Sequence, residues 1–496
     1  MRNQVVEVRE AIRQGIVSAS EQVAASRDRW KATHDWLNAL VQPRFEAAMT
    51  EAGEIHASDP RPLAGVPVSV KDCFAVRGLR TTLGILPRQH LEDDRDSELV
   101  RRVRAAGGVI VGKGNVPQAL YLHETDNPVF GRTLNPCDRA RGPGGSSGGD
   151  AAAVAAGVVS LAFGNDLAGS IRQPAHACGL VGYLPSSRCL GPGGAFNTMP
   201  TLQGMGSRAG VLTRSVGDAV LAVEAVAGHS LSPTTAADPL PTVGWWDTAG
   251  PIPSSAAVVR GVRDTVARLE AAGLRVLQVE AGLAELAGWI HLALVSGDGG
   301  QAIQSLLAGS LPIPQVGELL RIAGMPRWQR PLIAGLAGLV GRRIESMAVR
   351  KTGPLSTDAR DVVLRARYAL DEMLVQWRGA EGIDAIVCPV SALPALRHQT
   401  AGRLILAAFP CLFASVLDLP AATVPVTRVR SGETLGRRPS RDPVLRTSAE
   451  TDAGSVGLPI GVQVVALDGC EATLIKVIRE IERTAGFELL AKSGKE

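Results

Sequence analysis

The sequence predicts an α/β fold built around a largely parallel sheet, on three observations. A helical pattern at residues 96–106 leads through glycine into an apolar run at 107–112, the helix–strand alternation typical of a doubly wound sheet. Other short apolar runs, typical of buried strands, occupy residues 65–72, 385–389, 421–426 and 458–465. Of the 496 residues, 45% are hydrophobic and 20% are charged, which provides enough apolar material for a large core.

We expect four parts along the chain. Residues 1–60 form a helical N-terminal layer, because apolar residues recur with helical spacing over most of it. Residues 61–230 and 381–496 supply the core, and residues 231–380 are a largely helical region between them. Residues 204–210 are expected to be a loop, and the patterns further predict helices at 215–227 and 472–482 and a helix then a strand over 254–281. The polar stretch 428–454 is expected to be a mobile surface insertion.

Composition and charge exclude several classes of protein. A net charge of +4, with no basic helix interleaved with aromatics, argues against nucleic-acid binding. No run of eighteen apolar residues and no apolar leader core occur, so we expect no membrane-spanning helix and no signal peptide. The seven cysteines form no Cys-x-x-Cys, and no His-Glu-x-x-His is present. We therefore expect a cytoplasmic protein with no metal and no cofactor.

Two serine-bearing turns bracket a short Ala- and Val-rich stretch at 151–163. Residues 144–149 read Gly-Gly-Ser-Ser-Gly-Gly, and residues 165–174 read Asn-Asp-Leu-Ala-Gly-Ser-Ile-Arg-Gln-Pro. The glycines let the backbone approach a bound group closely, and the second turn leads into the N-terminus of a helix. Backbone N–H groups and a hydroxyl that converge in this way suit an oxyanion.

These two turns resemble the signature of the amidase signature family of serine hydrolases, and the resemblance extends over about residues 60–485. It implies that family's fold: a single large domain with a mixed, mostly parallel central sheet covered by helices. It also implies that Ser170 is the nucleophile and that Ser146 bridges it to a lysine. Residues 65–72, Gly-Val-Pro-Val-Ser-Val-Lys-Asp, match the family's lysine motif, which assigns that role to Lys71.

The choice of lysine at position 71 has its own physical logic. Only seven of the 52 basic residues are lysines, and a buried lysine can lose its proton whereas arginine cannot. The alternative is a solvated strand end. In the expected mechanism neutral Lys71 accepts a proton from Ser146, which takes one from Ser170 as that residue attacks an amide. Burial, with Arg172 beside the amine, is expected to lower its pKa.

The neighbouring residues are expected to support this relay. The backbone N–H groups of Leu167, Ala168, Gly169 and Ser170 would hold the oxyanion. Asp166 and Arg172 are expected to shape the turn, as is the hydroxyl of Ser147. Two positions depart from the family pattern. Ala168 stands where glycine is usual and would be strained if it needed φ > 0, and Asn165 stands where Thr or Ser is usual.

Several further stretches are similar to the fatty acid amide hydrolase branch of the family. Among them is residues 324–343, which resembles a membrane-binding cap. Its apolar run at 331–341 is too short to span a bilayer but suits a helix lying in the membrane interface, with flanking arginines toward the headgroups. The alternatives are a buried helix and a subunit contact. We expect a small-molecule N-acyl or fatty acid amide substrate and leave a homodimer open.

Other functions remain as alternatives. An aryl or short-chain amidase and the glutaminase-type component of an amidotransferase share the same signature. A catalytically silent binding protein is a third. The Gly-x-Ser-x-Gly at 145–149 lacks the preceding strand of an α/β-hydrolase elbow, and the Gly-rich turn lacks the Lys-Ser/Thr of a phosphate loop. His176 and Cys178 lie close to Ser170 in sequence, but on a helix they would face different ways and are expected to be packing residues.

Overall fold

The computed structural model describes residues 4–231 and 240–489 and contains one eleven-stranded sheet. Its strands lie in the order β1-β3-β2-β4-β6-β5-β10-β11-β9-β7-β8. The strands are β1 (Leu40–Pro43), β2 (Pro67–Lys71), β3 (Val109–Gly114), β4 (Leu161–Asp166), β5 (Val181–Leu184), β6 (Arg208–Thr213), β7 (Val243–Trp245), β8 (Val276–Gln278), β9 (Ala385–Pro389), β10 (Ala421–Arg428) and β11 (Pro459–Ala466).

The sheet is mixed, as expected, but the expectation that most of its strand pairings are parallel is wrong. Among the described strands, β2 pairs in parallel with β3 and β4, and β7 with β8 and β9. The other six pairings are antiparallel. The apolar pattern misses β4, β5 and β6, which stand in the middle of the sheet. Glycines at 164, 182 and 210 in these strands resemble turn signals, yet each lies where a Cβ would meet a neighbouring side chain or backbone atom within 3 Å.

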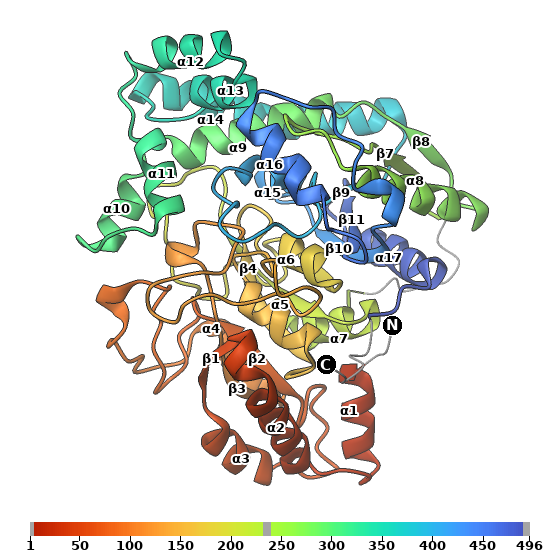
Figure 1. Cartoon of the computed structure of the whole chain (residues 1–496). Coiled ribbons are helices and arrows are strands. Elements are labelled where there is room, and N and C mark those ends of the chain that lie inside the picture. Colours follow the sequence, from red (N-terminus) through yellow and green to blue (C-terminus); the bar gives the residue numbers. More distant parts are fainter. Residues whose placement is uncertain (1–3, 232–239, 490–496) are drawn as a thin grey trace.

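Helices surround this sheet (Figure 1). They are α1 (Gln4–Arg13), α2 (Ala19–Leu37), α3 (Phe45–Gly53), α4 (Glu98–Ala105), α5 (Gly148–Ala155), α6 (Arg172–Cys178), α7 (Val216–Ala227), α8 (Ala256–Ala271), α9 (Gly282–Ser296), α10 (Gln301–Leu307), α11 (Pro314–Ala323), α12 (Arg330–Leu339), α13 (Arg343–Lys351), α14 (Thr357–Glu381), α15 (Leu412–Val416), α16 (Pro443–Asp452) and α17 (Glu471–Ala485). Short 3₁₀ turns cover Leu86–Arg88, Gln118–Leu120, Ile405–Cys411 and Ser431–Glu433. The helices predicted at 96–106, 215–227 and 472–482 are confirmed as α4, α7 and α17.

Helix α5 lies close to the segments around it because its first turn begins with two glycines. A Cβ on Gly148 would come within 2.0 Å of Thr125 Oγ1, and one on Gly149 within 2.1 Å of Asn115 N. The rest of the helix is mostly alanine and is largely buried. The Gly-Gly-Ser-Ser-Gly-Gly turn therefore lies deep in the protein, beside the C-terminal ends of β2 and β4.

The stretch 428–454 is more ordered than expected. Helix α16 occupies its second half and buries Val444, Thr447 and Ser448. Asp442 caps the helix by accepting from Val444 N at 2.9 Å, and its other oxygen accepts from Ile344 N at 2.9 Å. The expectation of a mobile insertion is wrong for this part, because a capped helix with a buried face packs on its neighbours.

Helix α12, from the proposed cap, projects at the end of the molecule opposite α2 and α3 (Figure 1). Trp328, Leu332, Leu336 and Leu339 are 76%, 62%, 55% and 85% exposed. Arg330 departs from expectation: it is buried and its guanidinium donates to Val349 O and Ile322 O, so it is a structural residue. In the described part of the chain no helix has the length and apolarity needed to cross a bilayer.

Candidate active site

Three side chains from separate elements form one hydrogen-bonded line. Lys71 ends β2, Ser146 precedes α5, and Ser170 lies in the turn between β4 and α6. Lys71 Nζ lies 2.7 Å from Ser146 Oγ, which lies 2.9 Å from Ser170 Oγ. Lys71 is fully buried and Ser170 is 9% exposed, so only the far end of the line reaches solvent. The distances allow a proton to pass between Ser170 and Lys71 through Ser146.

Burial lowers the pKa of Lys71 below its ordinary value, because the ammonium loses its hydration. Negative charge on Asp150 and Asp166 acts in the opposite direction. Asp150 is also buried; burial raises the pKa of its carboxyl to about 7, while Ser69 Oγ donates to its Oδ1 at 2.9 Å. The neighbourhood therefore disfavours charge on both the amine and the carboxyl.

The expected role of Arg172 in lowering that pKa is wrong. Its guanidinium forms a buried ion pair with Asp166 at 2.9 Å and also donates to Gln463 Oε1 at 2.6 Å and to Ser415 Oγ at 2.7 Å. The guanidinium is engaged by Asp166, and Arg172 is not among the groups that shift the pKa of Lys71. It instead fixes the turn, in agreement with its other expected role.

Asp166 organises the turn that carries Ser170. Its Oδ1 accepts from Gly169 N at 2.7 Å and its Oδ2 from Ile171 N at 3.0 Å. Burial by itself would raise the pKa of Asp166, but the charge of Arg172 and these N–H donors hold it well below its usual range. The carboxylate is therefore a permanent anchor for the backbone on both sides of Ser170.

One of the four N–H groups expected to hold an oxyanion is engaged within the protein. Gly169 N–H is already engaged by Asp166, whereas no hydrogen bond within the described residues engages the N–H groups of Leu167, Ala168 or Ser170. Gly169 carries the positive φ of the turn, at 98°, and Ala168 does not adopt a positive φ. The strain considered for Ala168 is therefore absent, and the residue that requires glycine is the next one.

Ser147 does not support the turn through its hydroxyl. Its Oγ is buried and has no hydrogen-bond partner among the described residues. The backbone N–H of Ser147 instead donates to Ser170 O at 3.1 Å. The turn carries two adjacent serines, but only the hydroxyl of Ser146 is aligned with Lys71.

Sequence reasoning misses the roles of two polar residues of the site. Asn165, at the end of β4, holds Lys71 by two contacts: Lys71 Nζ donates to Asn165 Oδ1 at 2.7 Å and to Asn165 O at 3.1 Å. His123 Nε2 lies 3.1 Å from Ala168 O, and burial lowers the pKa of this imidazole to about 4. The role of Asn165 could have been suspected from its departure from the usual Thr or Ser. No sequence pattern points to His123.

A cavity of about 590 Å³ opens at Ser170. Ser146, Asn165, Leu167 and Ser170 are among the residues that line it. Much of its wall comes from the long connection between β5 and β6. Apolar members of the wall are Leu120, Tyr121, Phe196, Met199, Leu202, Met205 and Val416, and charged members are Arg208, Arg367 and Asp418.

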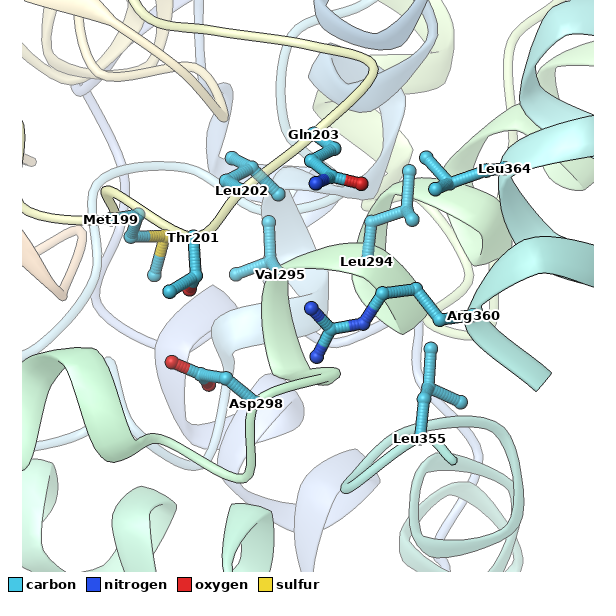
Figure 2. Close-up of a pocket in the computed structure, with 10 residues that line it drawn as sticks. All are labelled: Met199, Thr201, Leu202, Gln203, Leu294, Val295, Asp298, Leu355, Arg360 and Leu364. Carbon is cyan, nitrogen blue, oxygen red and sulfur yellow. The ribbon is translucent and has the colours of Figure 1, made fainter. Parts of the chain in front are cut away.

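Figure 2 shows a second, much smaller cavity of about 20 Å³ next to that wall. Met199 and Leu202 line both cavities, and Arg360 and Asp298 also line the small one. None of the residues in the serine turns lines it. The larger cavity is therefore the one that serves the site.

His176 and Cys178 are packing residues, as expected. Gly461 N donates to His176 Nδ1 at 3.1 Å, and the Nε2 of the same ring lies 3.1 Å from Leu393 O. Burial raises the pKa of the Cys178 thiol well above its ordinary value. Within residues 4–231 and 240–489 no group of three or more His, Cys, Asp or Glu side chains is arranged to hold a metal.

Comparisons with known proteins establish the family. The chain matches the family model described as Amidase over residues 21–475. It is 29% identical to fatty-acid amide hydrolase 1 of Sus scrofa over 452 residues, 85% of this chain and 76% of that protein. It is 38% identical to a glutamyl-tRNA(Gln) amidotransferase component of Nitratidesulfovibrio vulgaris (strain DP4) over 234 residues, 47% of each. A solved fatty acid amide hydrolase superposes with a TM-score of 0.81 at 20% identity, covering 98% of this chain and 85% of that one. The chain therefore belongs to the amidase signature family and is a hydrolase that acts on amide C–N bonds.

Proposed function

We propose that this enzyme hydrolyses N-acyl amides, with fatty acid amides as the substrate class, through an acyl-serine intermediate and a Ser-Ser-Lys triad. The observation that supports it best is the continuous line from Lys71 through Ser146 to Ser170, which ends at the large cavity. A buried amine at one end and an accessible hydroxyl at the other are what a proton relay to a nucleophile requires.

In the first half-reaction Ser170 Oγ forms a bond to the amide carbon. Its proton moves to Ser146 Oγ while the Ser146 proton moves to Lys71 Nζ. The carbonyl oxygen becomes an oxyanion held by the unengaged N–H groups of Leu167, Ala168 and Ser170, and each such donor contributes about 3 kcal/mol to catalysis. When the C–N bond breaks, the leaving nitrogen takes a proton from Ser146, which Lys71 replaces. Water then cleaves the acyl-Ser170 ester through the same relay, releasing acid and free enzyme.

The lining of the large cavity favours an amide with an extended apolar part. Phe196, Met199, Leu202 and Met205 provide an apolar wall in the cavity that Ser170 also lines. Similarity to fatty acid amide hydrolase extends over 85% of this chain, whereas the amidotransferase component matches 47% of it. An aryl or short-chain amidase is the second candidate, since Arg208, Arg367 and Asp418 make part of the same wall polar.

Labelling with a fluorophosphonate probe tests both the nucleophile and the substrate class. We expect covalent labelling at Ser170 and none in Ser170→Ala. Primary amides of graded acyl length should protect against labelling, with protection improving about fourfold for each methylene that is buried. Protection that is best for short or aromatic amides and lost for long chains would favour the second candidate over a fatty acid amide substrate.

We also propose that α12 contacts membranes. Leu332, Leu336 and Leu339 are exposed on one short helix, and Arg327, Arg342 and Arg343 are exposed at its ends. An amphipathic helix with basic flanks lies in the interface between headgroups and acyl chains. Fatty acid amides partition into bilayers, so contact at this end would bring the enzyme to its substrate.

Flotation with phosphatidylcholine vesicles, with and without phosphatidylserine, tests the contact. We expect wild type to float and Leu336→Glu/Leu339→Glu to float at least tenfold less. Two leucine side chains inserted into the membrane would contribute about 3 kcal/mol or more to binding. Leu435→Glu is the matched control, since Leu435 is 86% exposed on a loop outside the cap. Wild-type protein that does not float with vesicles of either lipid composition would contradict the membrane contact.

A further inference from the structure

Three oxygens surround the amine of Lys71, and two of them belong to Asn165. Asn165 Oδ1 lies 2.7 Å from Nζ, Asn165 O lies 3.1 Å away, and Ser146 Oγ lies 2.7 Å away. A neutral amine has only two N–H bonds and one lone pair. Both Asn165 oxygens can only accept, so they take both N–H bonds and leave the lone pair for the hydroxyl proton of Ser146.

The same contacts fix the orientation of the Asn165 amide. If Nδ2 instead of Oδ1 faced the amine, it would compete with Ser146 for the lone pair. With Oδ1 on Lys71, the Nδ2 group is left without any hydrogen bond to the described residues. Asn165 is 7% exposed and lines the large cavity together with Ser146 and Ser170. An amide donor without a protein partner therefore borders the space where the substrate must lie.

We propose that Asn165 is a substrate-binding residue that also positions Lys71: Oδ1 and the main-chain oxygen orient the neutral amine toward Ser146, while Nδ2 donates a hydrogen bond to an acceptor oxygen of the bound amide. This rests on the relay proposed above and adds a residue to it. The Asn165 side chain thereby contacts both Lys71, the proposed base, and the bound substrate. The usual Thr or Ser at this position is shorter and offers a freely rotating hydroxyl in its place.

Two replacements of Asn165 separate its two contacts. Asn165→Ala removes both the side-chain acceptor and the donor, and Asn165→Asp keeps an acceptor, loses the donor and adds a negative charge. An acceptor stabilises the ammonium more than the neutral amine, and a carboxylate does so more strongly. In a plot of kcat against pH, the acid limb is the rise of kcat as Lys71 loses its proton. This limb is therefore expected to move to lower pH in Asn165→Ala and to higher pH in Asn165→Asp. Loss of the Nδ2 donor is expected to raise KM about fivefold in both.

The other titratable groups around Lys71 are unchanged in these variants. They are Cys73 after β2, Asp150 on α5, Asp166 at the end of β4, and His123, whose pKa Lys71 also lowers. Burial raises the pKa of Cys73 to about 12, so this thiol is uncharged in the working range. Asn165→Thr restores the usual family residue and is expected to fold and to give a limb between those of the alanine and aspartate variants, which keeps the test intact if Asn165→Asp is unstable.

Opposite displacements of the limb, with melting temperatures close to wild type, would support the positioning role, since a merely structural residue would not move the profile in both directions. Displacements in the same direction, or none, would overturn it. An unchanged KM in both Asn165→Ala and Asn165→Asp would overturn the substrate contact. These failures differ from failure of the relay itself, in which Lys71→Ala would keep its activity whatever the Asn165 variants do.

Discussion

Replacing Ser170 with alanine is expected to lower kcat for amide hydrolysis by about 10³-fold or more, with little change in KM. The hydroxyl at 170 ends the Lys71–Ser146 line at the cavity and is its most exposed member, so no neighbour is placed to form the bond to substrate in its stead. The turn should survive, because Asp166 holds it through backbone groups and Arg172, none of which the substitution touches. The remaining activity would come from the oxyanion donors and binding alone.

Ser147→Ala is the matched control for that measurement. Ser147 adjoins Ser146 in the same turn and is fully buried, but its hydroxyl has no hydrogen-bond partner among the described residues. Removing it is expected to change kcat by less than about threefold, since no hydrogen bond is lost. A steady-state assay with one amide substrate compares the two variants. Full activity in Ser170→Ala, or a large loss only in Ser147→Ala, would show that Ser170 is not the nucleophile.

The site can be predicted from the sequence because its chemistry lies in short, contiguous motifs. Lys71, Ser146 and Ser170 each belong to a segment whose residue order alone carries the signal, and the structure brings all three within hydrogen-bond distance. The role of Asp166 follows in the same way, because a carboxylate shortly before a turn usually accepts from the backbone N–H groups of that turn.

The sequence does not predict which hydrogen-bond partner a group takes when several partners are within reach. Gly169 N–H is a plausible oxyanion donor from its position in the turn, but Asp166 Oδ1 takes it. Arg330 flanks the apolar run of the cap and would suit a membrane face, but it is drawn inward by the carbonyls of Ile322 and Val349. In both cases the local sequence indicates which groups could form a hydrogen bond, but tertiary packing decides which partner each group takes.

The sheet shows the same limit at a larger scale. Strand β3 is predictable because Val109, Ile110 and Val111 form an uninterrupted β-branched run. Strand β6 overlaps the predicted loop and contains Gly210, which interrupts its apolar pattern, yet a Cβ there would lie 2.4 Å from Tyr183 O of β5. The glycine is required by close approach of the neighbouring strand, and that distance is a property of the assembled sheet.

Activity is expected to rise with pH, and Lys71→Ala is expected to remove that rise together with at least about 10³-fold of kcat. Only the neutral amine can accept the Ser146 proton, so the rate increases as pH rises through the pKa of Lys71 and levels off above it. Burial places this pKa below the ordinary lysine value of about 10.4. The imidazoles of His123 and His176 do not produce this limb, because their pKa values are lowered to about 4.

Asp150 is a neighbour that could produce a similar limb, because burial raises its pKa to about 7. The two sources predict different outcomes for Asp150→Asn. If the limb belongs to Lys71, removing a negative charge beside the amine favours its neutral form, so the limb moves to lower pH and the plateau is kept. If the limb belongs to Asp150, the substitution abolishes it. A kcat profile for wild type, Lys71→Ala and Asp150→Asn therefore assigns the proton, and a flat wild-type profile between about pH 6 and 9 alongside an active Lys71→Ala would exclude the amine as the base.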